Sequence, residues 1–386
     1  MIDTVVLIIQ EGFYKVLDPN KFTPSTETLD RLGGFGAKAF AKCLQNPTKE
    51  DTQKGIYKPR LTITKRATKS GIIKTLKIEF SSSKLLFLNN LNELTDNDFS
   101  LLIDTLRQRL FEMGVEISKT SLQLATVSTV HYSKNIILPS FVTSTMIIKE
   151  LAKVNITKRL SLDKTFFKNQ GHALAFYSKS YSIVIYDKIK DIQKTTGVKV
   201  DGDPTNFQQG LFEDKKPSSE ILRIEIRLNH PYKIESLFKA IGKPADRSFI
   251  NVFKEEKAKL VIQHYWSIIT NSVNKFIFTS DESLHKTAEE IYQSNPSISA
   301  IKLLSIIGYF QFVKQDSGRT LREFIEENYT SRTWFRISKV IKDTLKTKKS
   351  LKYLTFVTEI NKAIEEFKPI KPVDFQAEMI NNDKDD

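Results

Sequence analysis

The chain has 386 residues, 40% of them hydrophobic and 27% charged, a composition typical of a soluble globular protein with room for two domains. Its single cysteine, Cys43, excludes an intrachain disulfide framework and a zinc site built on several cysteines. The apolar runs are too short to span a bilayer, and the first residues lack the pattern of a secretory signal. We therefore expect a cytoplasmic protein with no membrane partner.

The charge of the chain indicates a polyanionic partner. Its net charge is +14, from 59 Lys and Arg against 45 Asp and Glu. Residues 374–386 are acidic and carry a net −4, so the rest of the chain carries +18. Such a surplus favours nucleic acid or an anionic membrane surface, and a generally basic solvated surface is the plain alternative.

The first part of the chain mixes strands and helices. Alternating or β-branched side chains predict strands at residues 3–9, 61–65, 76–80, 124–131, 180–186 and 221–228. Residues 69–71 predict a turn, residues 96–113 a helix that ends at Gly114, and residues 149–154 a short helix. The stretch 195–219, rich in Gly, Asp, Pro and Lys, predicts a surface loop.

The order of these elements predicts the fold class. From residue 233 onward the pattern becomes mostly helical. We therefore predict an α+β fold, with a largely antiparallel sheet domain over residues 1–275 and a small all-α, helix-turn-helix-like domain over residues 276–368. The acidic composition of residues 369–386 predicts a disordered tail.

Tyr186 is a candidate nucleophile. It ends the clearest apolar strand, and the two-residue repeat places it on one face with Ser182 and Val184. A helical turn after the strand would bring Lys188 and Asp191 near it. A phenol has a pKa of ~10 and attacks well only when its proton is removed or its anion is stabilised. An ordinary buried tyrosine at a strand end is the alternative interpretation.

The strand at 221–228 carries an Arg-x-Glu-x-Arg stripe on one face, formed by Arg223, Glu225 and Arg227. The carboxylate can hold a divalent cation, and the guanidinium groups can clamp a phosphate. A solvated sheet face with cross-strand ion pairs is the alternative.

Residues 301–346 predict two short helices, a turn and a third, basic helix. On this third helix, apolar side chains including Trp334 share one face, and the opposite face carries Arg332, Arg336, Lys339 and Lys346. This layout is typical of a helix-turn-helix DNA reader, in which the cations contact phosphates. A membrane-surface helix and a simple solvated helix face have similar charge patterns.

Several short motifs follow one another in a defined order from residue 1 to about residue 350. They are residues 1–3 (Met-Ile-Asp), 57–61 (Tyr-Lys-Pro-Arg-Leu), 77–81 (Lys-Ile-Glu-Phe-Ser), 84–90 (Lys-Leu-Leu-Phe-Leu-Asn-Asn), 183–188 (Ile-Val-Ile-Tyr-Asp-Lys), 222–225 (Leu-Arg-Ile-Glu), 307–310 (Ile-Gly-Tyr-Phe) and 334–336 (Trp-Phe-Arg). Together they resemble the replication initiators of filamentous phages, the gene II protein family, with relatives among rolling-circle plasmid initiators.

The resemblance implies roles for particular residues. It places the nucleophile on Tyr186, with Lys188 and Asp191 at matching positions, and metal ligands at Glu225 and Glu79. Where relatives carry an Arg-Ile-Asp strand, residues 129–131 read Thr-Val-His, and the imidazole of His131 can also ligate a metal. The implied cofactor is Mg²⁺ or Mn²⁺.

The implied activity is initiation of rolling-circle replication of a phage or plasmid in a bacterial host. A metal-dependent site-specific nickase would cut the double-stranded origin, form a 5′-phosphotyrosine and leave a 3′-OH for the host polymerase, with a host helicase as a further partner. Arg223, Arg227 and the basic helix would contact DNA. A non-catalytic DNA-binding regulator that kept this fold is the second hypothesis, and a membrane-surface protein is the third.

Overall fold

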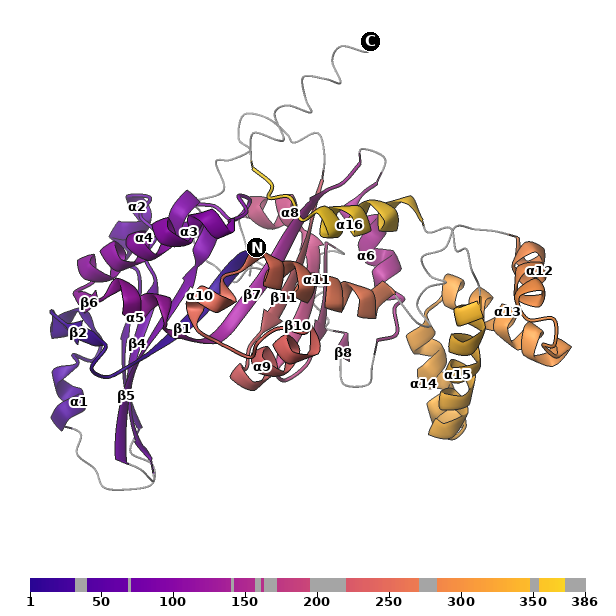
Figure 1. The fold of residues 1–386 in the computed structure, drawn as a ribbon, viewed down its shortest axis with the longest axis horizontal. Coiled ribbons are helices and arrows are strands. Elements are labelled where there is room, and N and C mark those ends of the chain that lie inside the picture. The colour runs from indigo at the N-terminus through magenta and orange to yellow at the C-terminus, as the bar shows by residue number, and fades with distance from the viewer. Residues whose placement is uncertain are drawn as a thin grey trace, which may run out of the picture.

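The computed structural model describes residues 1–31, 40–68, 71–139, 142–156, 161–162, 172–194, 220–270, 283–347 and 354–371 (Figure 1). Two residues of the turn predicted at 69–71 (69 and 70), the predicted loop at 195–219 and most of the predicted tail lie outside the described residues. Among the described helices, none combines the length and the apolar character needed to cross a membrane.

A nine-stranded sheet forms the centre of the molecule, and all its described pairings are antiparallel. Its strand order is β3-β4-β5-β1-β7-β11-β10-β9-β8. A small second sheet pairs β2 (Tyr14–Val16) with β6 (Val115–Ile117). The strands of the large sheet are β1 (Ile2–Gln10), β3 (Phe40–Gln45), β4 (Arg60–Thr68), β5 (Gly71–Ser81), β7 (Thr126–Ile137), β8 (Ser161–Leu162), β9 (Ala173–Tyr177), β10 (Tyr181–Asp187) and β11 (Ile221–Leu228). The prediction of a largely antiparallel α+β fold is confirmed.

Helices cover one face of this sheet, and α9, α10 and α11 lie in front of β7 and β11 in Figure 1. The two-residue repeat of each strand sends alternate apolar side chains into the main core. Ile224 and Ile226 of β11 lie there, and so does Tyr132 of β7, whose hydroxyl donates to the Val252 carbonyl (3.0 Å). The helices of the sheet domain are α1 (Glu27–Arg31), α2 (Lys49–Gln53), α3 (Ser82–Phe87), α4 (Phe99–Glu112), α5 (Lys119–Gln123), α6 (Ser144–Ala152), α8 (Lys188–Gln193), α9 (Pro231–Ala240), α10 (Phe249–Val252) and α11 (Glu255–Thr270).

The helix expected at residues 96–113 starts later than predicted. A 3-10 turn (Asp96–Asp98) precedes α4, and Asp98 is the residue before the first α-helical turn. Gly114 follows the helix with a φ of 80°, a left-handed conformation that glycine adopts without strain, so the predicted end is confirmed.

A separate group of helices lies to the right in Figure 1 and comprises α12 (Leu284–Ser294), α13 (Ala300–Gln315), α14 (Gly318–Asn328) and α15 (Ser331–Thr347). The three helices predicted over residues 301–346 are therefore present. Lys153, just after α6, connects this group to the sheet domain. Its ammonium group donates to the Lys314 carbonyl (3.0 Å), and its own carbonyl accepts from the Gly318 amide (3.3 Å).

The chain returns to the sheet domain after these helices. Helix α16 (Thr355–Glu366), which falls inside the predicted 276–368 domain, packs on α11 and β7. Its Val357 and Ile360 lie in the main core, and the Trp266 indole donates to Asn361 Oδ1 (2.7 Å). Ile370, at the start of the predicted tail, is hydrogen-bonded to Glu93.

Candidate functional site

The face of the sheet opposite the main core carries a compact group of polar side chains. Strand register aligns them in rows, because Tyr186 of β10 lies opposite Arg223 of β11, and Arg227 lies opposite His131 of β7. Glu225 lies in the row between them. The predicted alternation in β10 is confirmed, since Tyr186 packs with Val184, Ala173 and Ala175 in a small cluster apart from the main core.

Asp3, His131 and Glu225 form a group that could hold a metal ion. One ligand atom from each lies within 4.8 Å of the others, and they come from three adjacent strands, β1, β7 and β11. Both carboxylates are buried, and the imidazole is 18% exposed. Two carboxylates and one imidazole form a donor set that suits Mn²⁺, and the carboxylates also suit Mg²⁺. The residues present therefore fit the expected divalent cation.

Asp3 was not predicted as a ligand. Ile2 and Val5 both face the core, and a register shift between them in the β1–β7 pairing leaves Asp3 on the other face. A signal for it exists in the sequence, because Asp3 is the only charged residue in the largely apolar strand β1. A carboxylate at such a position needs a buried partner.

Glu225 is the centre of the site. Its Oε1 accepts from Arg227 Nε (2.9 Å) and lies 3.3 Å from His131 Nδ1, and its Oε2 accepts from the Tyr186 hydroxyl (3.2 Å). Burial raises the pKa of the Glu225 carboxyl, but the charges of Arg227, His131 and Arg223 and the hydrogen bond from His131 outweigh it. The pKa therefore lies well below its usual value, and Glu225 stays ionised. Such a carboxylate is a weak base and a good metal ligand.

Arg223 contacts both carboxylates of the site. Its Nη2 lies 2.9 Å from Asp3 Oδ1 and donates to Ser133 Oγ (2.9 Å), and its Nε lies 3.9 Å from Glu225 Oε2. Its Nη1 donates to the Asn90 carbonyl (2.7 Å) and to Asn135 Oδ1 (3.2 Å). Arg223 was predicted to contact DNA, but it is buried and its described contacts are internal. Arg227 is 17% exposed and reaches the surface.

The predicted surroundings of Tyr186 are largely present. Helix α8 begins directly after β10, and the Lys188 ammonium lies 5.7 Å from the centre of the Tyr186 ring. Lys188 Nζ and Asp191 Oδ2 are 3.9 Å apart, and both residues are buried, as is Tyr186. The phenol thus has the cation of Lys188 over its ring, while its hydroxyl donates to the ionised Glu225.

The two tyrosines nearest to Tyr186 in sequence occupy different places. Tyr181 packs against the main core, where its ring centre is 5.1 Å from that of Tyr265, so it points away from Tyr186. Tyr177 of β9 lies opposite Ser182 and therefore shares the face of Tyr186, where it is exposed.

Glu79 lies outside the group of three. It is on β5, 37% exposed, and its carboxylate binds Lys77 Nζ at 2.8 Å. The structure therefore places this predicted ligand in a surface ion pair on a neighbouring strand.

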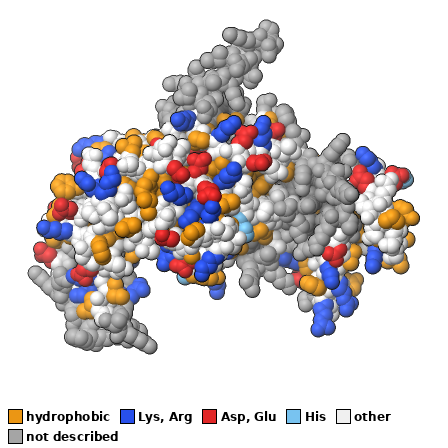
Figure 2. All heavy atoms as spheres, viewed as in Figure 1, with side chains coloured by type: hydrophobic (Ala, Val, Ile, Leu, Met, Phe, Trp, Pro, Cys, Tyr) orange, Lys and Arg blue, Asp and Glu red, His pale blue; other side chains and the backbone are white. Residues whose placement is uncertain are grey.

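The predicted basic helix lies far from this site in the sequence and exposes its cations. Arg332, Arg336 and Lys339 of α15 are exposed, as is Phe335 between them. Lys346 lies within α15, but its side chain is outside the described residues. Figure 2 shows Lys and Arg side chains gathered over α14 and α15 at the lower right.

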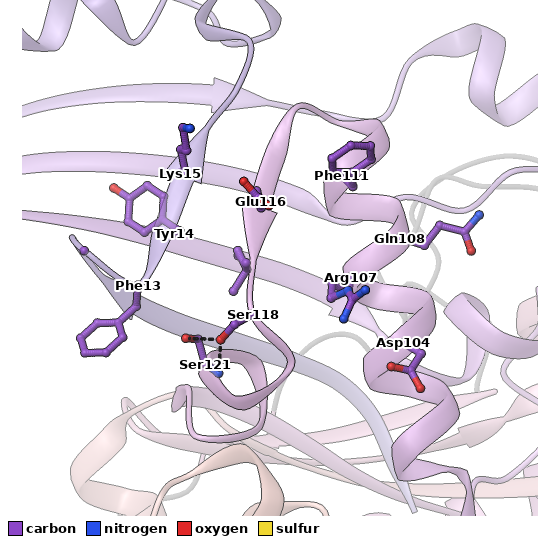
Figure 3. A pocket seen from close by; sticks show the side chains of 12 residues that line it. Phe13, Tyr14, Lys15, Asp104, Arg107, Gln108, Phe111, Glu116, Ser118 and Ser121 are labelled. Carbon is purple, nitrogen blue, oxygen red and sulfur yellow. Dashed lines mark hydrogen bonds between the residues drawn. The ribbon is translucent and has the colours of Figure 1, made fainter.

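A surface pocket of about 1000 Å³ lies elsewhere, between β2, β6 and α4 (Figure 3). Its charged lining residues balance, with Lys15 and Arg107 against Asp104 and Glu116. Ser118 and Ser121 in its wall bind each other (2.8 Å). This pocket shares no residue with the Asp3–His131–Glu225 group.

The chain matches no protein-family model, no curated protein and no solved structure. The resemblance to the gene II protein family therefore rests on the order of the sequence motifs alone. The functional proposal rests on the geometry of the site.

Proposed function

We propose that this protein is a metal-assisted DNA nickase that initiates rolling-circle replication of a phage or plasmid in a bacterial host. One observation carries the proposal. The Tyr186 hydroxyl is hydrogen-bonded to Glu225, and Glu225 also belongs to the only group of three potential metal ligands among the described residues. A nucleophile, a group that can hold a metal ion and the partly exposed Arg227 are parts that suit phosphoryl transfer.

The proposed reaction transfers a phosphodiester to the tyrosine. The Tyr186 oxygen forms a bond to phosphorus, the phosphorus–O3′ bond breaks, the phenol loses its proton and the O3′ oxygen gains one. The positive charges of Arg223 and Lys188 favour the phenolate and offset the negative charge of Glu225 beside it. The product is a 5′-phosphotyrosine and a 3′-OH that a host polymerase can extend.

Asp3, His131 and Glu225 would hold the divalent cation. When bound, the cation supplies positive charge at the scissile phosphate. The low pKa of Glu225 supports this role over that of a general base, because the carboxylate holds no proton near neutral pH and accepts one poorly.

The helices α13–α15 would bind the origin duplex. The exposed cations of α15 support contact with phosphates, and the succession of three helices supports a helix-turn-helix reader. The net charge of +14 supports the same partner.

The second candidate is a DNA-binding regulator without nicking activity. The observation that favours it is the complete burial of Tyr186, because a nucleophile has to reach its phosphate. Catalysis by this tyrosine requires the site to open when DNA binds, whereas a regulator requires no such change.

A nicking assay separates the two candidates. The protein is incubated with supercoiled circular DNA of the replicon that encodes it, with Mg²⁺ or Mn²⁺ and with EDTA as control. The proposal expects nicked circles and a protein–DNA adduct that survives denaturant only when the cation is present. Tight origin binding with neither product would establish the regulator instead.

A further inference from the structure

The residues that follow α16 form a short segment that packs beside the candidate site. We call residues 367–370 the C-terminal strap. Phe367 lies in the main core, and Ile370 packs on a small apolar cluster that includes Leu91, Ile189 and Ile221. The strap therefore lies beside β11 and α8, the two elements that carry Glu225 and Lys188.

Two hydrogen bonds of the Ile370 backbone join the strap to Glu93. The Ile370 amide donates to Glu93 Oε2 (3.1 Å), and the Glu93 amide donates to the Ile370 carbonyl (3.1 Å). The Lys134 ammonium binds both the Glu93 carboxylate and the Lys368 carbonyl. Glu93 and Lys134 are buried, so this pair depends on the strap for part of its hydrogen bonding.

Glu93 in turn supports Asn135, two residues from Ser133 on β7. The backbone amide of Asn135 donates to Glu93 Oε1 (2.6 Å), and its side-chain Nδ2 donates to the Leu91 carbonyl (2.9 Å). Asn135 Oδ1 then accepts from Arg223 Nη1, which also donates to the Asn90 carbonyl. The same segment of residues 90–93 thus contacts the strap on one side and Arg223 on the other.

Arg223 completes the connection, because its guanidinium group binds Asp3 and lies close to Glu225. We infer that the C-terminal strap, acting through Glu93 and Lys134, is a positioning element that holds Arg223 and thereby keeps Asp3 and Glu225 at the spacing a metal ion needs. This inference rests on the metal site of the proposed function. Glu93 and Lys134 are positioning residues, since neither belongs to the group of potential ligands.

The test uses the full chain and Mn²⁺ alone, without DNA. Ile370→Pro removes the amide hydrogen that Glu93 accepts, and Ile370→Ala keeps that hydrogen while it shortens the side chain. The Mn²⁺ dissociation constant is measured from the free Mn²⁺ signal in electron paramagnetic resonance. Thermal unfolding and duplex binding are followed in parallel.

Loss of a partner that orients metal ligands weakens metal binding by about 10–100-fold. We expect Ile370→Pro to fall at the low end, about 10-fold, because Glu93 and Asn135 stand between the strap and Arg223. Ile370→Ala is expected to bind Mn²⁺ within about 3-fold of the native chain, and all variants to bind duplex DNA alike.

A second substitution keeps the test decisive if Ile370→Pro does not fold. Glu93→Gln preserves the shape of the side chain but removes the charge that holds Lys134, and it is expected to weaken Mn²⁺ binding by a similar factor. Unchanged Mn²⁺ affinity in the folded variants would overturn the role of the strap and leave the metal site in place. Equal weakening by Ile370→Ala and Ile370→Pro would overturn the hydrogen-bonded route. Absence of Mn²⁺ binding by the native chain would overturn the metal site itself, and this inference with it.

Discussion

Replacing Glu225 by Gln is the most informative single change to the site. The substitution preserves the shape of the side chain and removes its charge, while the buried Arg223 and the partly buried Arg227 remain. Because the pKa of Glu225 lies well below its usual value, the native carboxylate is ionised at neutral pH and the change removes a full negative charge.

The cost in stability follows from the contacts of Glu225. Removing one partner of a buried ion pair costs about 3–5 kcal/mol, because the other charge is left uncompensated. Arg223 retains Asp3 at 2.9 Å, and Arg227 is partly open to water, so we expect the low end, about 3 kcal/mol. Denaturant unfolding measures this loss, and the protein should remain folded in the absence of denaturant.

The same variant tests the chemistry. Loss of one of three potential ligands should abolish or strongly slow nicking and weaken Mn²⁺ binding, while duplex binding through α15 is retained. Glu79→Gln is the matched control. It removes a carboxylate from a surface ion pair with Lys77, which is worth at most about 1 kcal/mol, and nicking should be unchanged.

Two results would refute this reasoning. An unfolding free energy of Glu225→Gln within about 1 kcal/mol of the native value would mean that the carboxylate does not compensate Arg223 and Arg227. Normal nicking and Mn²⁺ binding at low metal concentration, despite the lost stability, would mean that Glu225 only balances these two cations.

Three further changes test separate parts of the molecule. Tyr186→Phe removes one buried hydrogen bond to the ionised Glu225, worth about 1.5–3 kcal/mol, and should abolish both nicking and the covalent adduct, whereas Tyr177→Phe should leave both intact; an adduct that maps to any other residue contradicts the assignment. A triple substitution to Ala removes three exposed cations of α15, Arg332, Arg336 and Lys339. It should flatten the log–log salt dependence of duplex binding by up to ~3 units, and an unchanged slope would mean that this helix does not contact the duplex. Burial raises the pKa of Asp187 from 3.8 to about 6, so the folded state binds more protons between these values and stability should fall as pH rises from about 4 to 6. Asp187→Asn should remove up to about 3 kcal/mol of this fall, and parallel pH profiles of the two proteins would contradict it.

Local patterns in the sequence predicted the strands and helices that carry most of the site. The alternation in residues 221–228 matches β11 residue for residue, and it places Glu225 opposite the core. The same repeat places Tyr186 on one face of β10 with Val184. These predictions succeed because the side-chain direction along a strand depends only on the two-residue repeat of the backbone.

The short strands β3 and β9 were missed. The five residues of β9, Ala173–Tyr177, are buried except at the end and show no alternation. Their strand conformation depends on pairing with β10 and β8, which a local pattern does not contain.

Only the tertiary structure decided which charges meet. Asp3 joins His131 and Glu225 because β1 pairs with β7 and β7 pairs with β11, contacts between segments more than 80 residues apart. For the same reason Glu79 stays outside the group, and the residues after α16 return to Glu93. Residue type and spacing determined which side chains could bind a metal or a phosphate, whereas strand order and burial determined which of them share a low-dielectric site, because those depend on long-range packing that no single segment specifies.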